Sequence, residues 1–260
     1  MPRKTQLLDA ADSYRIEPIP DRIAILASGG LDSSVMLGVI ARSGRHVFPV
    51  YIQAGLGWEA CELSALKRFV RAIKLPNIEP VKLLKLPMGD VAGDHWSITG
   101  SGVPGYDAEL ASNYILGRNL SLLAKAAIFC ARERIGEIAI APLESNPFPD
   151  ARPEFFRAFA KAVELGVGIK LQIKTPFAGF TKADVVRAGA GMPLELTVSC
   201  ACPDGNRHCG TCTKCAERVQ GFREAGVPDP TLYAIKPKPP REVSRHRSAS
   251  PVTAPVARRR

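Results

Sequence analysis

The sequence predicts an α/β protein with a doubly wound parallel sheet, and three observations support this. Short apolar runs alternate with segments of helical periodicity from residue 23 to residue 86, as β-α-β units require. The first run, Ile23-Ala24-Ile25-Leu26, is continuously apolar, which is typical of a strand buried on both faces. A glycine- and serine-rich turn then leads into a helix, at the strand end where such sheets bind ligands.

The remaining elements follow in order along the chain. Strands are expected over residues 46–52, 81–86, 137–141 and 171–176, and helices over residues 35–41, 58–73, 118–134, 155–165 and 182–188. The second of these helices shows the basis of the assignment, because its apolar residues recur at steps of three and four: Leu63, Leu66, Val70 and Ile73. Thr181 is the expected cap of the last helix.

Residues 87–113 interrupt this alternation. They contain five glycines and two prolines, and a loop of this length inside a compact domain is usually a lid or a binding segment. Within it, His95 and Trp96 either stack on a flat substrate or pack the loop against the body of the protein.

Composition limits the class of protein. The chain has 260 residues, of which 46% are hydrophobic, so one large domain with a substantial core is expected. No apolar run reaches the roughly 18 residues of a membrane-spanning helix, and residues 1–6 are not followed by a signal-peptide core. We therefore expect a cytoplasmic protein that does not associate with a membrane.

The net charge of +10 lies mostly at the C-terminus. Residues 236–260 hold eight Lys or Arg residues and one Glu, a net charge of +7, which leaves +3 for residues 1–235. This tail is also rich in Pro, Ser and Ala, so we expect it to be disordered. It could contact nucleic acid or an acidic partner, but a solvated tail without a specific partner is the favoured interpretation.

The turn after the first strand, residues 27–34, has the composition of an anion site. Gly29 and Gly30 allow the backbone to turn sharply and to approach a ligand closely. Ser33 and Ser34 offer hydroxyls just before the following helix, whose free N–H groups and positive dipole end suit a phosphate. Asp32 would be out of place unless a metal ion lay between its carboxylate and the phosphate. The simpler alternative is an ordinary strand-to-helix turn with a serine cap.

Five of the seven cysteines lie between residues 200 and 215. Four of them have the spacing Cys-x8-Cys-x2-Cys-x2-Cys, which suits a closed tetrahedral zinc site: Cys200, Cys209, Cys212 and Cys215. Cys202 and His208 are surplus ligand candidates. A redox dithiol and an iron–sulfur site are the alternatives, and zinc is favoured because the spacing is tight.

The segment Ser28-Gly29-Gly30-Leu31-Asp32-Ser33 resembles the signature of the PP-loop ATP pyrophosphatases. Further motifs in the same order are similar to those of the QueC/ExsB family of 7-cyano-7-deazaguanine synthases. They are residues 117–119 (GRN), 149–155 (PDARPEF), Thr175-Pro176, the four cysteines and Arg218-x-x-Gly221-Phe222. The resemblance covers about residues 22–222. It implies an adenine nucleotide α-hydrolase-like sheet, with residues 21–190 as the ATP pyrophosphatase domain and 191–227 as the zinc-binding region. Residues 1–20, a lead-in, and 228–260, the disordered basic tail, are additions to the family pattern.

The resemblance also implies a reaction and its residues. A deazaguanine carboxylate is adenylated with ATP and Mg²⁺, ammonia displaces AMP to give an amide, and a second activation dehydrates the amide to a nitrile. Asp32, Ser33 and Arg118 would be catalytic, and Arg118, Asn119 and Asp150 would bind the substrate. The nucleotide would lie against Ala27, Ser28, Gly29, Gly30, Leu31, Asp32, Ser33, Ser34, Val35, Met36 and Leu37. A homodimer is left open.

One segment departs from the family. After the second strand the family has a Tyr-Gly-Gln-x-His-like segment, whereas residues 51–59 here read YIQAGLGWE and lack the histidine. Other enzymes therefore stay open: a PP-loop enzyme that adenylates a different carboxylate or acts on tRNA, including one that thiolates tRNA. A non-catalytic zinc-bearing nucleic-acid module is the third alternative, and it leaves residues 28–34 without a role.

Overall fold

The computed structural model describes residues 14–239, and within them five parallel strands form one sheet in the order β3-β2-β1-β4-β5. The strands are β1 (Arg22–Leu26), β2 (His46–Gln53), β3 (Lys82–Lys85), β4 (Glu137–Ala139) and β5 (Gln172–Lys174). The central strand β1 pairs in parallel with β2 on one side and with β4 on the other. Along the chain, β2 and β3 are added on one side of β1, and β4 and β5 are then added on its other side. The strand order therefore reverses between β1 and β4.

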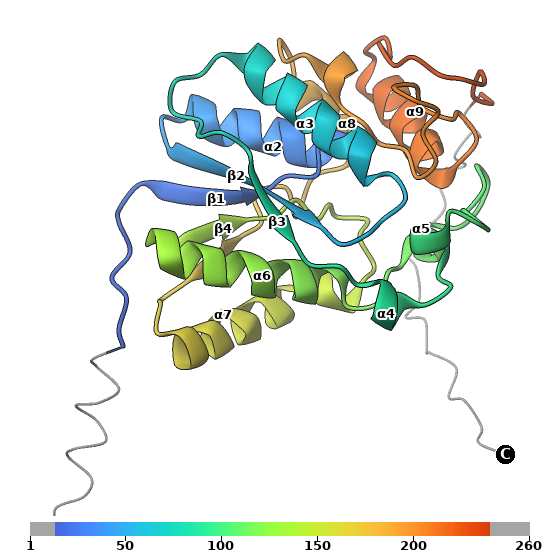
Figure 1. Cartoon of the computed structure of the whole chain (residues 1–260). Coiled ribbons are helices and arrows are strands. Elements are labelled where there is room, and N and C mark those ends of the chain that lie inside the picture. The colour runs from blue at the N-terminus through green and yellow to red at the C-terminus, as the bar shows by residue number, and fades with distance from the viewer. Residues whose placement is uncertain (1–13, 240–260) are drawn as a thin grey trace, which may run out of the picture.

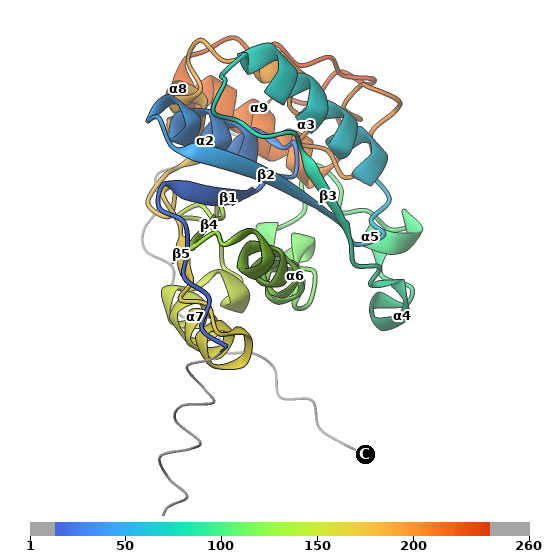
Figure 2. The same cartoon turned by 60° about the vertical axis from the view of Figure 1, so that its left-hand side comes forward.

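Helices cover both faces of this sheet, as Figure 1 shows. One face carries α2 (Leu31–Arg42), α3 (Glu59–Ile73), α8 (Lys182–Ala188) and α9 (Thr213–Ala225), and the other carries α6 (Arg118–Glu133) and α7 (Pro153–Val167). The turned view in Figure 2 shows the same two layers. Because side chains alternate along a strand, Ile23 and Ile25 pack with the first group and Ala24 packs with the second. The predicted doubly wound parallel sheet is confirmed.

Helix α2 begins earlier than the sequence pattern predicts. It starts at Leu31, inside the glycine- and serine-rich turn, and not at residue 35. Gly29 has φ +78°, and this left-handed conformation turns the chain away from the direction of β1. Gly30 is extended and precedes the first helical residue. Asp32 and Ser33 therefore lie in the first helical turn, where the N–H groups lack intrahelical partners.

The segment 87–113 is built of short helices joined by turns. They are α4 (Gly89–Ala92), α5 (Trp96–Thr99) and the 3₁₀ helix η1 (Leu110–Asn113). The segment begins at the carboxyl end of the sheet, because the Met88 N–H donates to the carbonyl of Ala54, just after β2. Two further 3₁₀ helices are η2 (Pro149–Ala151) and η3 (Leu194–Leu196).

A buried arginine ties the C-terminal elements together. Arg218 of α9 is 1% exposed and donates to Thr197 Oγ1 (2.8 Å), to the carbonyl oxygen of Leu194 (2.9 Å) and to Thr231 Oγ1. Asp229 lies 3.7 Å away and supplies the opposite charge. A guanidinium without these partners would be costly to bury, which explains why several separate segments converge on it.

The start of the expected tail differs from the sequence prediction. Residues 228–239 were expected to be disordered, yet the N–H of His208 donates to the carbonyl of Leu232, and the N–H of Ala234 donates to the carbonyl of His208. Lys238 also pairs with Asp107 at 2.8 Å. The rest of the tail, residues 240–260, lies outside the described residues, as do residues 1–13 of the expected lead-in. Within residues 14–239 no helix is long and apolar enough to cross a membrane.

Candidate active site

A cavity of about 260 Å³ opens at the carboxyl ends of β1 and β4. Its floor includes Leu26 and Ala27 at the end of β1 and Ile140 and Ala141 just after β4. This is the point where the strand order reverses, which is the usual ligand site of doubly wound sheets. The first turn of α2, the first turn of α3, the start of α6 and the segment around residue 200 supply its walls.

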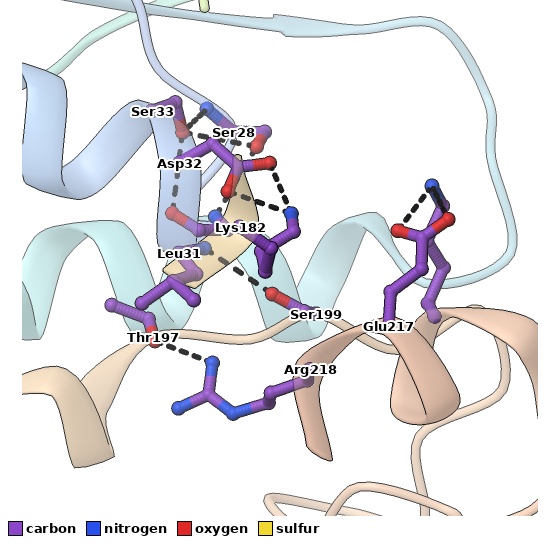
Figure 3. Close-up of polar contacts among 11 residues, drawn as sticks. Ser28, Leu31, Asp32, Ser33, Lys182, Thr197, Ser199, Glu217 and Arg218 are labelled. Atoms are coloured by element: carbon purple, nitrogen blue, oxygen red, sulfur yellow. Dashed lines mark hydrogen bonds and ion pairs between the residues drawn. The ribbon is translucent and has the colours of Figure 1, made fainter. Parts of the chain in front are cut away.

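The turn after β1 forms a cradle held by its own hydroxyl groups (Figure 3). The N–H of Ser28 donates to Ser33 Oγ (3.1 Å), and the N–H of Gly30 donates to Ser28 Oγ (3.2 Å). The two hydroxyl oxygens lie 3.2 Å apart. The predicted residues Ala27, Ser28, Gly30, Leu31, Asp32 and Ser33 line the cavity, whereas Ser34, Val35, Met36 and Leu37 are buried in the helix behind it.

Close contacts clamp this turn from two sides. A Cβ atom on Gly29 would lie 2.3 Å from the backbone oxygen of Glu62 in α3, so only glycine fits. From the other side, the N–H of Val198 donates to the carbonyl of Gly29 (2.8 Å), and the N–H of Leu31 donates to Ser199 Oγ (3.3 Å). The cradle is therefore held in shape by elements distant in sequence.

Lys182 is a cavity residue that the sequence reasoning missed. Its Nζ donates to both carboxylate oxygens of Asp32 (Figure 3), at distances of 2.6 and 2.7 Å. Lys182 is the first residue of α8, and α9 packs closely there, since a Cβ on Gly221 would lie 2.2 Å from Lys182 Cγ. One feature of the sequence could have indicated Lys182 as a site residue. It directly follows the capping Thr181, at the start of a helix that comes after a strand of the same sheet.

Three predicted substrate residues divide into two groups. Arg118 and Asn119, at the start of α6, line the cavity, and Arg118 Nε is buried without a hydrogen-bond partner among the described residues. Asp150 is buried and does not line the cavity. Its carboxylate accepts the backbone N–H of Asn119 (2.8 Å), and its carbonyl accepts the Asn119 amide group (3.1 Å). Asp150 thus fixes the start of α6 and orients Asn119.

Two glutamates of α3 line the cavity. Glu59 is the last residue of the segment that departs from the family, and its carboxylate closes that segment by accepting the N–H groups of Ala54 (2.5 Å) and Gly55 (3.2 Å). Glu62 lies one turn further along α3 and accepts a hydrogen bond from the Tyr51 hydroxyl (3.1 Å). Burial raises the pKa of Glu62 to about 7, although the positive charge of Arg118 opposes the shift.

Two tryptophans form one wall. The rings of Trp58, before α3, and Trp96, in α5, are stacked with centroids 5.5 Å apart, and both line the cavity. His95 instead caps α5, where its Nδ1 accepts the N–H of Ser97. Trp96 therefore packs the segment 87–113 against the body and at the same time faces the cavity.

Five thiols gather beside the cavity, one more than the four predicted. The sulfur atoms of Cys200, Cys202, Cys209 and Cys212 lie within 4.8 Å of one another. The Cys215 sulfur lies 3.8 Å from that of Cys209 and 3.6 Å from that of Cys212. Thiolates grouped in this way can hold a metal ion, and Cys200 also lines the cavity.

Burial and backbone contacts distinguish the five. Cys215 is fully buried and accepts the N–H of Gly210 (3.4 Å), and Cys209 accepts the N–H of Thr211 (3.3 Å), as thiolates in structural metal sites do. Cys202 is exposed. His208 is not available as a metal ligand through Nε2, because this atom accepts the N–H of Ser199 (2.9 Å). Burial lowers the pKa of His208 to about 4, so its ring is neutral.

A family model described as "Queuosine biosynthesis protein QueC" matches residues 22–226. The chain belongs to the QueC family. The matched range begins at β1 and ends just after α9, so it includes the cradle, the cavity and all five clustered cysteines. The resemblance inferred from the motifs is confirmed.

Relatives of this QueC chain carry matching names. A 7-cyano-7-deazaguanine synthase from Anaeromyxobacter sp. (strain Fw109-5) is 35% identical over 229 residues, which cover 83% of this chain and 97% of the relative. One from Methanothrix thermoacetophila is 34% identical and covers 82% and 98%. Among solved structures, a 4-thiouridine synthetase–RNA complex with bound ATP gives a TM-score of 0.41 at 14% identity, covering 82% of this chain and 47% of that one.

Proposed function

We propose that this QueC chain is an ATP-dependent 7-cyano-7-deazaguanine synthase. It adenylates the carboxylate of 7-carboxy-7-deazaguanine, forms the amide with ammonia, and then activates the amide so that it dehydrates to the nitrile. The observation that carries the proposal is the shared cavity: the anion cradle after β1 and Arg118 at the start of α6 line the same space, in a chain of this family. Adenylation needs a phosphate and a carboxylate side by side.

The cradle suits the phosphates of ATP. The backbone at Gly29 and Gly30 would let the phosphates approach closely, and the Ser28 and Ser33 hydroxyls and the N–H groups of Asp32 and Ser33 in the first turn of α2 would hold them. Asp32 would hold Mg²⁺, which supplies charge neutralisation at the phosphates. Lys182 now neutralises Asp32 and lies within reach of the same anions, so it would add a positive charge at this site.

The opposite side of the cavity suits the deazapurine. Arg118 can pair with its carboxylate, because a guanidinium matches a carboxylate with two parallel hydrogen bonds. Asn119, oriented by Asp150, can bind a polar edge of the ring system. The stacked Trp58 and Trp96 offer an aromatic surface against a planar heterocycle.

We assign a zinc ion to the cysteine cluster, held by Cys200, Cys209, Cys212 and Cys215. Cysteine thiolates are soft ligands that suit zinc, and four buried ones close its tetrahedral shell. The zinc ion would be structural: it would hold the chain around residue 200, which forms one wall of the cavity.

The test is incubation with ATP, Mg²⁺, ammonium and 7-carboxy-7-deazaguanine, followed by mass analysis of the product. The expected product is the nitrile, with AMP and pyrophosphate. Asp32→Ala and Ser33→Ala should abolish pyrophosphate release while the chain stays folded, whereas Asp90→Ala, outside the cavity, should leave pyrophosphate release unchanged. The unusual segment 51–59 favours a second candidate, adenylation of a different carboxylate, and pyrophosphate release only with other acids would establish it.

A further inference from the structure

A buried carboxyl group in the cavity has no role in the proposed function so far. Glu62 is 9% exposed, lines the cavity, and lies on the first turn of α3. We propose that Glu62 is a catalytic residue, whose carboxylate takes the protons that the substrate nitrogen loses as the amide and the nitrile form. This inference rests on the proposed function.

The position of Glu62 relative to the cradle is fixed by direct contact. Its backbone oxygen is the atom that a side chain on Gly29 would strike. Its N–H donates to the carbonyl of Trp58, which starts α3 beside the cavity. The carboxyl group therefore lies in the same cavity as both the cradle and Arg118, where a carboxylate undergoing adenylation has to lie.

Comparison with the other acids of the cavity singles out Glu62. Asp32 is paired with Lys182, Glu59 accepts two backbone N–H groups, and Glu217 is paired with Lys214 at 3.2 Å. Glu62 has a neutral hydroxyl, that of Tyr51, as its hydrogen-bond partner. Among the described residues that line the cavity, it is the acid whose oxygen atoms neither a cation nor backbone N–H groups occupy.

The groups that face Glu62 come from three elements. Arg118 of α6 carries a positive charge, Tyr51 of β2 donates a hydrogen bond, and Glu59 of the same helix adds a negative charge. The indole of Trp58 is also near. Burial outweighs the effect of Arg118, so the pKa of about 7 keeps both protonation states populated near neutral pH. A group in that range can accept a proton and release it again.

The proton balance of the reaction requires such a group. When ammonia adds to the acyl-adenylate, a C–N bond forms, the C–O bond to AMP breaks, and the nitrogen must lose one proton to become the amide. When the amide oxygen has been adenylated, the nitrogen loses its two remaining protons as the third C–N bond forms and AMP leaves with the C–O electron pair. Glu62 accepts these protons one at a time and returns each to water.

The proposal separates adenylation from nitrogen chemistry, which makes it testable with Glu62→Gln. Exchange of pyrophosphate into ATP, dependent on 7-carboxy-7-deazaguanine, requires no proton transfer from nitrogen and should stay near the wild-type rate. Formation of amide and nitrile should fall by about 10²- to 10⁴-fold, the usual contribution of general base catalysis. Glu79→Gln, the same change at an ion pair outside the cavity, is the matched control and should keep both rates.

A second variant reports on the ionisation itself. Tyr51→Phe keeps the Glu62 carboxylate and removes the hydrogen bond that lowers its pKa, so the pKa of Glu62 should rise. The acid limb of the pH–rate profile for amide formation should therefore move to higher pH. A residue with a purely structural role would not shift this limb. Wild-type rates of amide formation in Glu62→Gln would overturn the proposal and leave the proposed function standing. If the wild-type chain itself makes no amide, both are wrong.

Discussion

Replacing Glu62 by glutamine is expected to stabilise the fold above neutral pH and to change it much less in mild acid. In the folded chain the Glu62 carboxyl is buried, and burial raises its pKa from 4.5 to about 7. The unfolded chain ionises this group near its ordinary value. Between these two pH values the folded state binds the proton and the unfolded state does not, so rising pH favours unfolding.

The size of the effect follows from that interval. A pKa shift of one unit corresponds to about 1.36 kcal/mol, so a rise from 4.5 to about 7 corresponds to about 3 kcal/mol. The stabilising contribution of the protonated carboxyl is complete below pH 4.5, falls as the pH rises to about 7, and is lost above that. The glutamine side chain of the variant has the shape of the protonated acid and does not titrate, so the variant escapes this loss.

The measurement is urea unfolding of wild type and Glu62→Gln at about pH 5 and about pH 8. The difference in unfolding free energy between the two proteins should grow by roughly 2–3 kcal/mol in favour of the variant from the lower to the higher pH. Other titrating groups cancel in that difference, and Glu195→Gln, at an exposed glutamate outside the cavity, should show no such change. An equal difference at both pH values would mean that Glu62 ionises normally, and the argument from burial would be refuted.

Three other outcomes are expected. Lys182→Met should lower pyrophosphate release by about 10²-fold without unfolding the chain, and an unchanged rate would remove Lys182 from the phosphate site. Cys215→Ser should lose the bound zinc in metal analysis, whereas Cys202→Ser should retain one ion per chain; the reverse result would place Cys202 in the metal shell. Removal of residues 240–260 should leave turnover of the free deazapurine nearly unchanged, and its loss would mean that the tail completes the site.

The fold and the location of the site could be predicted because their signals are local. A continuous apolar run such as residues 23–26 indicates a strand buried on both faces, and the helical periodicity of residues 58–73 indicates one covering helix. Once these elements alternate, parallel strands place the turn at residues 27–34 at the ligand edge of the sheet. The short helices within 87–113 were not predicted, because segments of four residues carry no periodicity.

The contacts within the site could not be predicted, because they join residues far apart in the chain. The ion pair between Asp32 and Lys182 spans 150 positions and depends on how closely α8 and α9 pack at Gly221. Asp150 and Asn119 appear as two separate polar residues in the sequence, and the structure shows that one orients the other. Such pairings are set by the register of packed helices, which local patterns do not determine.

The cysteine region and the cradle after β1 form one structural unit. Val198 and Ser199, directly before Cys200, bond to Gly29 and Leu31 of the cradle, and the N–H of Ser199 is in turn held by His208, next to Cys209. A metal ion bound by the cysteines would fix both ends of this connection. The proposed zinc site would therefore shape the cradle without forming part of it, because the segment that the zinc ion anchors completes the hydrogen bonding of the first turn of α2.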